Sequence, residues 1–94
     1  MTRLGEYRPV HLAAKGGHAR VVEVLLTAGA DPAARTSTGG ATPLHFAAAS
    51  GGVGAIQALL EHGAAVDAIE LGWGQTPLMF AAAAGRVEAV YALL

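Results

Sequence analysis

The sequence contains no cysteine, and aromatic and charged residues are scarce. Without cysteine the chain has no disulfide, no thiolate nucleophile and no Cys-ligated zinc. Charged residues make up 14% of the chain, well below the roughly 25% usual in soluble domains, and aromatic residues make up 5%. The formal net charge of −1 leaves no basic excess to neutralise phosphates, which argues against a nucleic-acid platform. The 53% of hydrophobic residues and the low net charge argue equally against disorder.

The length of 94 residues suits one domain and excludes a two-domain enzyme. The chain has 22 alanines and 13 glycines, so its core must be built by close approach of the backbone rather than by large side chains. The segment from Met1 to Pro9 is charged throughout and is not a signal peptide, so the compartment stays unknown, with the cytoplasm as the default. The stretch from Thr36 to Leu60 carries no formal charge. Its proline, glycine and polar residues argue against membrane insertion.

One pattern occurs three times along the chain, and each copy contains a proline. The three prolines are equally spaced, and a glycine follows each of them at the same distance in the sequence. The aligned positions are Pro9, Pro43 and Pro77 with Gly17, Gly51 and Gly85. An apolar segment ending in Leu-Leu then completes each copy. This many matched positions in three copies indicates a repeat architecture.

Each copy predicts a short helix, a second helix and a connector. Thr42 and Thr76 are good N-caps, and a proline at the first helical position favours a helix of about two turns. We expect these first helices at 9–15, 43–50 and 77–84, each ended by a glycine. The second helices have apolar residues at helical spacing, and Gly29 and Gly63 end the first two. Residues 31–41 and 64–75 hold glycine, proline and polar side chains, which favours hairpin-like connectors.

This unit resembles the ankyrin repeat, whose signature includes Thr-Pro-Leu-His-x-Ala at a period of about 33 residues. The closest copy begins at Thr42 with Thr-Pro-Leu-His and continues with Ala47 and Ala48. Copy one has Arg8 in place of the threonine and Val10 in place of the leucine, and copy three has Met79 in place of the histidine. The resemblance implies an all-α solenoid of helix-turn-helix units joined by β-hairpin-like connectors.

The resemblance also implies repeat boundaries. The repeats span about 1–35, 36–69 and 70–94, and the third is truncated. Both intervals between prolines exceed the family period by one residue, so we expect longer connector tips at 36–40 and 70–74. The chain stops at Leu94 inside a second helix, which suggests a longer array or a C-terminal face covered by another chain. End-to-end self-association through that face is a further hypothesis.

The resemblance implies a non-catalytic protein–protein interaction scaffold without a cofactor. A stack of small-residue helices provides an extended concave surface and no deep pocket, which agrees with that implication. The alternative is a structural spacer or stacking segment of a longer repeat protein whose activity lies elsewhere. An enzyme is a distant third, because Ser37 and Ser50 have no histidine and acid in register and the glycine clusters lack phosphate-binding spacing.

His11 and His45 occupy equivalent positions in adjacent repeats. Stacked helices lie about 8 to 10 Å apart, too far for both imidazoles to ligate one zinc at about 2 Å. We therefore predict no metal site. We interpret both side chains as buried or half-buried imidazoles that bond to the backbone and tie a hairpin to its helix.

The resemblance places partner contacts at the connector tips and in the groove beside the first helices. The candidate residues are Lys15, Arg35, Thr36, Ser37, Thr38, Ser50, Leu71, Trp73 and Gln75. Ala49, Ala83 and Ala84 would line the same groove. Trp73 lies between two glycines and has two open interpretations: an exposed interface anchor, or a staple packed over Tyr7, Leu71 or the next helix.

Gly54 is an unusual residue for the position that we assign to it. It lies in the first turn of an expected helix, where glycine costs up to about 1 kcal/mol relative to alanine. We therefore expect the middle repeat to be softer at this position than its neighbours.

Overall fold

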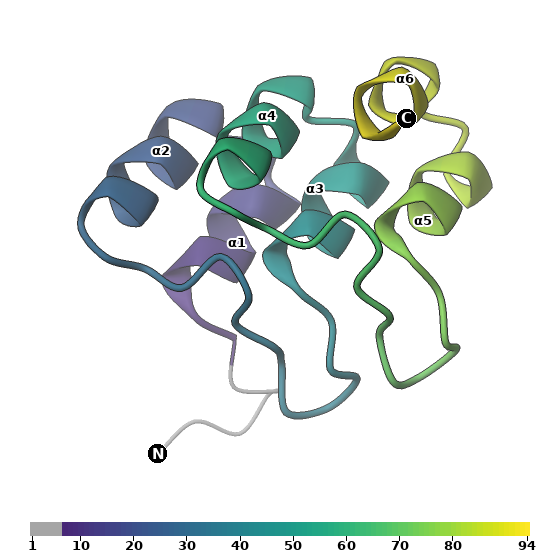
Figure 1. Cartoon of the computed structure of the whole chain (residues 1–94), viewed down its shortest axis with the longest axis horizontal. Helices are drawn as coiled ribbons and strands as arrows, with labels where there is room; N and C mark the ends of the chain where they lie inside the picture. The colour runs from purple at the N-terminus through teal and green to yellow at the C-terminus, as the bar shows by residue number, and fades with distance from the viewer. Residues whose placement is uncertain (1–6) are drawn as a thin grey trace.

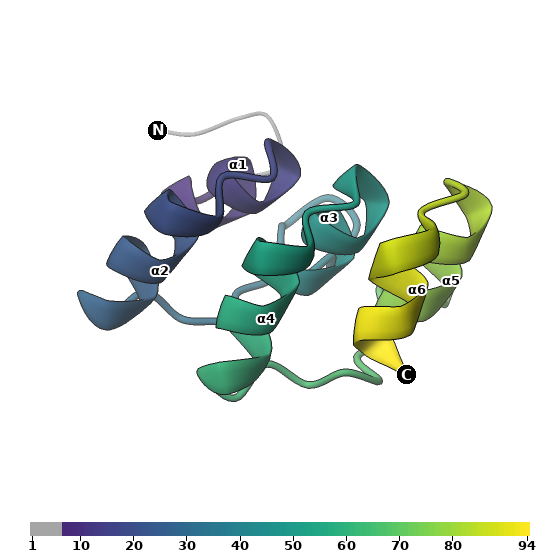
Figure 2. The same cartoon turned by 90° about the horizontal axis from the view of Figure 1, so that it is seen from above.

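The computed structural model describes residues 7–94, which form six helices arranged as three adjacent pairs. The helices are α1 (Pro9–Lys15), α2 (Ala19–Thr27), α3 (Pro43–Ser50), α4 (Val53–Glu61), α5 (Pro77–Ala83) and α6 (Val87–Leu93). The first helices of the pairs form an inner row, α1, α3 and α5, and the second helices form an outer row (Figure 1). Neighbours contact each other along both rows, so the pairs stack in chain order as a solenoid (Figure 2). Met1 to Glu6, which include most of the segment judged not to be a signal peptide, lie outside the described residues.

The predicted helix starts and stops are present, with one difference. Thr42 precedes α3 and Thr76 precedes α5, where the Oγ1 atom of Thr76 accepts the Met79 N–H at 3.3 Å. The turns after the three inner helices contain glycines with φ of 71°, 79° and 70°, a left-handed conformation that only glycine adopts without strain. α5 ends at Ala83 rather than Ala84, because the N–H of Gly85 bonds back to Ala82 and the helical ladder stops there.

Alanine provides much of the core, as the composition predicts. Ala14, Ala48 and Ala81 are fully buried where the helix pairs meet. The largest apolar side chains in the same core are Leu44, Ile56 and Leu59, each with no exposed surface. Full burial of such a side chain contributes about 1.5 to 3 kcal/mol relative to exposure. The middle pair, covered on both sides, therefore contains the best-packed part of the chain.

Gly54 lies in the first turn of α4 and faces α2. A Cβ atom built on Gly54 would lie 2.8 Å from the Cβ of Ala19, closer than two carbons can approach. Glycine at this position therefore allows α2 and α4 to pack closely. Glycine has a weak helix propensity, but the close packing of the two helices requires it at this position. The sequence alone did not indicate this requirement.

Two connectors join the pairs and extend away from the helices on one side of the molecule (Figure 1). They occupy the residues between α2 and α3 and between α4 and α5. No strand is assigned in the described part of the chain, but each connector is closed near its tip by backbone hydrogen bonds, as expected of a hairpin-like segment. None of the helices within residues 7–94 combines the length and the apolar composition that crossing a membrane requires.

Candidate partner-binding surface

The two connector tips, residues 36–41 and 70–75, have the same backbone geometry. The N–H of Thr36 donates to the Ala41 carbonyl at 3.0 Å, and the N–H of Glu70 donates to the Gln75 carbonyl at 3.0 Å. Inside each loop a glycine with φ of 65° or 70° bonds back to the residue that opens the tip. Equivalent bonds at equivalent positions of successive repeats give two loops of one shape.

Thr36 holds the first tip from inside. Its Oγ1 atom accepts hydrogen bonds from the N–H of Gly39 at 3.4 Å and from the N–H of Ala41 at 3.3 Å. Only 5% of its surface is exposed. Thr36 was expected among the residues that contact a partner, and the structure corrects this placement, since a hydroxyl occupied within a closed loop is not accessible. Ser37 and Thr38, which follow it, are exposed.

Glu70 plays the same part in the second tip and was not among the candidate residues. Its two carboxylate oxygens accept the N–H of Gln75 at 2.6 Å and the N–H of Trp73 at 2.8 Å. Its side chain is buried, with 3% of the surface exposed. The hydrogen bond from Gln75 is the largest cause that lowers the pKa of this carboxyl below its ordinary value; burial opposes it with a smaller rise, and the bond from Trp73 lowers it further. Glu70 occupies the position of Thr36 in the next repeat, and this equivalence was the one sequence signal for its role. The signal was not recognised because the two residue types differ.

Arg35 joins the two tips. Its Nη1 atom donates to the carbonyl oxygens of Gly40 at 2.6 Å and Ile69 at 2.8 Å, so one side chain holds both connectors. The N–H of Leu71 adds a backbone bond to the Gly39 carbonyl at 2.8 Å. The side chain of Leu71 covers Gly40, where a built Cβ would lie 2.8 Å from the leucine Cγ. The tips therefore lie side by side in a fixed arrangement.

Leu71 and Trp73 are the large apolar side chains of the second tip. They are 78% and 83% exposed. The interpretation of Trp73 as a staple packed over Tyr7, Leu71 or the next helix is contradicted by this exposure. The Trp73 backbone is nevertheless fixed by Glu70, so an exposed indole projects from a well-anchored loop. The half-buried Gln75 uses its backbone to bond with Glu70 and His45.

The remaining expected residues were assigned to a groove beside the inner helices. Lys15, Ala83 and Ala84 are exposed, and Ala49 is half-buried. Ser50 is also half-buried, and its hydroxyl bonds to the carbonyl of Ala14 at 3.2 Å and of Ala47 at 3.0 Å. Ser50 thus joins the first two helix pairs, which limits its availability to a partner.

Aromatic contacts along the inner row were not predicted. The Phe46 ring packs edge-on against His11 with centroids 5.8 Å apart, and the Phe80 ring packs against His45 at 4.9 Å. Tyr7 lies beside Phe46 at 5.3 Å. These rings give the inner helices a partly apolar surface. The sequence signal was the phenylalanine that directly follows position 45 and recurs at the same position of the next repeat.

Both predicted histidines are buried and bond to the backbone, as expected. The Nδ1 atom of His11 accepts the N–H of Arg8 at 2.9 Å, and its Nε2 atom lies 2.8 Å from the Ala34 carbonyl oxygen. Burial is the largest cause that lowers the pKa of both His11 and His45. With both nitrogens occupied by the backbone, neither ring offers a lone pair to a metal. Among the residues that the structure describes, no three His, Asp or Glu side chains form a metal-binding group.

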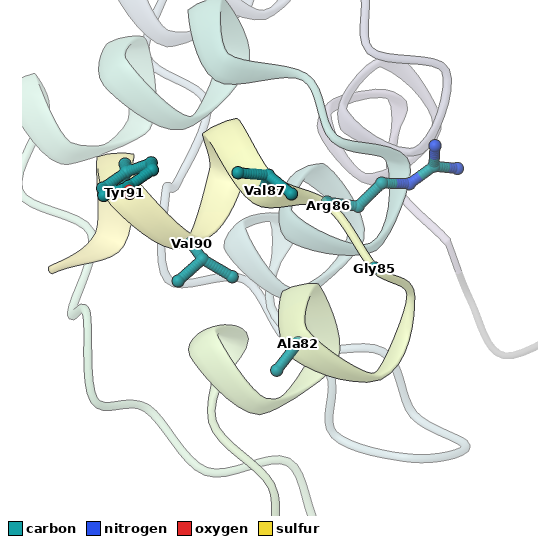
Figure 3. Close-up of a pocket in the computed structure, with 6 residues that line it drawn as sticks. All are labelled: Ala82, Gly85, Arg86, Val87, Val90 and Tyr91. Atoms are coloured by element: carbon teal, nitrogen blue, oxygen red, sulfur yellow. The ribbon is translucent and has the colours of Figure 1, made fainter.

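A shallow hollow of about 360 Å³ lies on the outward face of the third helix pair (Figure 3). Its lining residues are Ala82, Gly85, Arg86, Val87, Val90 and Tyr91. Ala82 and Val90 correspond in the repeat register to Ala48 and Ile56, which are fully buried between pairs. The hollow therefore presents the kind of surface that the middle pair buries against its neighbour.

The chain was compared with known protein families. A family model for ankyrin repeats, containing three copies, matches residues 10–94. The match includes the six helices, apart from the first residue of α1, and both connector tips. No curated protein matches the chain.

Proposed function

Because the chain belongs to the ankyrin-repeat family, we propose that it is a scaffold that binds a partner protein through its connector tips and the adjacent face of α1, α3 and α5. Ankyrin repeats are generally protein–protein interaction modules and are typically non-catalytic. The observation that carries the proposal for these particular residues is the exposure of Leu71 and Trp73 on a fixed tip. Large exposed apolar side chains grouped on one loop more often form an interaction site than stabilise an isolated monomer.

The rigidity of the tips supports the same proposal. Arg35, Glu70 and the bond from Leu71 to Gly39 fix the tips before any partner arrives. A surface that is already ordered loses little conformational entropy on binding, so more of the contact energy appears as affinity. Trp73 has the size and the exposure of an interface anchor. Each helix pair with its connector would form one repeat, at 1–35, 36–69 and 70–94.

The test is a comparison of variants against a partner isolated from a displayed library of natural protein fragments. Calorimetry would compare the native chain with a tip variant, Leu71→Ser and Trp73→Ala combined. Val24→Ser is the matched control, since Val24 is 57% exposed on the outer helix α2. We expect the tip variant to lose affinity and the control to keep it. Equal binding by the tip variant, with a loss in the control, would refute this assignment of the surface.

A second candidate is the stacking role, and the hollow beside Ala82 and Val90 favours it. On this proposal the outward face of the third pair contacts another protein surface, for instance the first pair of a second copy. Sedimentation velocity over a range of concentrations tests the self-association form, with Val90→Asp as the disrupting variant. A single monomeric species at all concentrations would exclude it. If substitutions at the tips and in the groove left the function of the protein unchanged, a spacer would be favoured over a scaffold.

A further inference from the structure

We propose that the partner segment bound by the tips carries a carboxylate next to a bulky apolar side chain, and this inference rests on the proposed scaffold function. The tip cluster, which we define as Arg35, Leu71 and Trp73, supplies the complementary groups. Arg35 would receive the carboxylate, and Leu71 and Trp73 would receive the apolar side chain. The occupant is therefore an acidic and apolar peptide segment of another protein.

The Arg35 guanidinium is already oriented. Its Nη1 atom makes two hydrogen bonds, to Gly40 and to Ile69, and the side chain remains exposed. Within residues 7–94 the Nε and Nη2 atoms form no hydrogen bond, which leaves N–H donors of this exposed, planar side chain without a partner. An arginine held in this way matches a carboxylate through two parallel hydrogen bonds. Its position is fixed before the carboxylate arrives, so little side-chain entropy is lost.

The apolar half of the cluster lies directly beside that guanidinium. Arg35 bonds to the carbonyl of Ile69, which shortly precedes Leu71 in the chain. The Leu71 side chain rests on Gly40, whose carbonyl is the other acceptor of Arg35. Trp73 follows on the same tip and is the most exposed large apolar side chain described. A ligand whose acid and apolar side chain are neighbours would contact all three residues at once.

The charges around the surface favour an acidic occupant. The described inner helices, the two tips and Arg35, which directly precedes the first tip, carry three charged side chains: Lys15, Arg35 and Glu70. Lys15 and Arg35 are exposed, whereas Glu70 is buried and its carboxylate is occupied by backbone N–H groups. The other described acids lie on the outer helices or in the connectors before the tips: Glu23, Asp31, Glu61, Asp67 and Glu88. The exposed charge on this surface is therefore positive although the whole chain has a net charge of −1.

The experiment selects random displayed dodecapeptides without tryptophan against the whole chain. Selected peptides are then synthesised and titrated while the fluorescence of Trp73, the one tryptophan of the chain, is followed. We expect selection of peptides with Asp or Glu next to Leu, Ile or Phe. We expect Arg35→Gln to weaken their binding about tenfold or more, as for a lost hydrogen bond to a charged group. Arg20→Gln, an exposed arginine of the outer helix α2, is the matched control and should bind as the native chain does.

A second measurement remains decisive if Arg35→Gln does not fold. The acid of a selected peptide is replaced by its amide, and this peptide is titrated against the native chain. We expect the same loss, about tenfold, and no additional loss when the amide peptide meets a folded Arg35→Gln variant. Full affinity of the amide peptide would overturn the inference.

The remaining outcomes separate this inference from the scaffold proposal. Selection of basic or neutral peptides that lose affinity with Trp73→Ala would overturn the acidic partner and leave the scaffold surface in place. Peptides insensitive to every tip and groove variant would overturn both. Failure to select any peptide that binds at micromolar concentration would also overturn the inference, because a fixed cluster of this kind should bind a short segment.

Discussion

His45 joins the start of α3 to the far end of the following connector: its Nε2 atom lies 2.8 Å from the Gln75 carbonyl oxygen, and its Nδ1 atom accepts the N–H of Thr42 at 3.1 Å. His11 makes the equivalent link between Arg8 and Ala34. Because each Nδ1 atom faces a backbone N–H, the proton of the neutral ring must lie on Nε2, where it is donated to a carbonyl. A second proton would leave Nδ1 unable to accept, so these links require the neutral imidazole.

The first prediction is a loss of stability in mild acid. Burial lowers the pKa of His11 and His45 in the folded state below the ordinary 6.5. The folded state then binds fewer protons than the unfolded state, so stability rises with pH in this range. The contribution is complete above about pH 6.5 and is lost as the pH falls through the lowered values. Urea unfolding measured at intervals between pH 5 and pH 8 would show the decline.

A matched control separates these two histidines from the others. His18 and His62 are exposed and form no side-chain hydrogen bond within residues 7–94. Replacing both by glutamine should leave the decline between pH 5 and pH 6.5 unchanged. Replacing His45 by glutamine should reduce the decline and lower the stability at pH 8. An identical pH profile in the His45 variant would refute the assignment.

The second prediction concerns the carboxylate inside the second tip. Glu70→Ala removes the acceptor for the N–H groups of Trp73 and Gln75, so the melting temperature should fall. Glu70→Thr should cost less, because Thr36 serves the equivalent tip with a single oxygen. Thermal unfolding followed by circular dichroism would rank the three chains. Equal melting temperatures of the alanine and threonine variants would contradict the proposed role of the acceptor.

The same carboxylate gives a third prediction, a further loss of stability in stronger acid. Backbone hydrogen bonds, first that from Gln75, lower the pKa of Glu70 in the folded state below the ordinary 4.5. Its contribution is therefore complete above pH 4.5 and is lost as the pH falls through the lowered value. Urea unfolding below pH 4.5 should decline more steeply for the native chain than for Glu70→Thr, which has no carboxyl at this position. If the stabilities of the two chains fell in parallel below pH 4.5, this loss could not be assigned to Glu70.

The fourth prediction is that Gly54→Ala destabilises the chain although alanine favours helices. The added Cβ would lie 2.8 Å from that of Ala19 and force α2 and α4 apart. We expect a net loss of about 1 to 3 kcal/mol in the free energy of unfolding, the usual cost of overpacking. The double variant with Ala19→Gly removes the clash. Its loss in the free energy of unfolding should therefore be smaller than the sum of the losses in the two single variants. Strict additivity in chemical denaturation would argue against the contact.

The sequence predicted the helices well because their signals are local. A proline at the first helical position, Thr42 and Thr76 as caps and glycine at the stops all act within a few residues. The repeat register then placed equivalent helices side by side, since a repeat unit buries its apolar face only against a neighbour. The roles of His11 and His45 followed from the same register.

The connector tips were harder to predict because their contacts cross between repeats. Arg35 bonds to the carbonyl of Ile69 in the next repeat, and the chemistry of an arginine side chain gives no sign of this partner. Thr36 resembled an exposed loop residue but fills the inside of its loop. Gly54 appeared weak because propensity is a local measure, whereas its clash partner Ala19 lies on another helix.

The last prediction separates binding from stability at Trp73. The side chain is 83% exposed, so Trp73→Ala should change the free energy of unfolding by no more than about 0.5 kcal/mol, as surface substitutions usually do. Loss of an interface anchor typically costs about 2 kcal/mol or more in binding. Leu59→Ala, in the fully buried core, is the opposite control and should cost about 2 to 5 kcal/mol of stability. Thermal unfolding and partner titration on the same samples measure both quantities. A large fall in melting temperature with unchanged affinity in Trp73→Ala would assign the indole to packing, because an anchor acts on the complex rather than on the free chain.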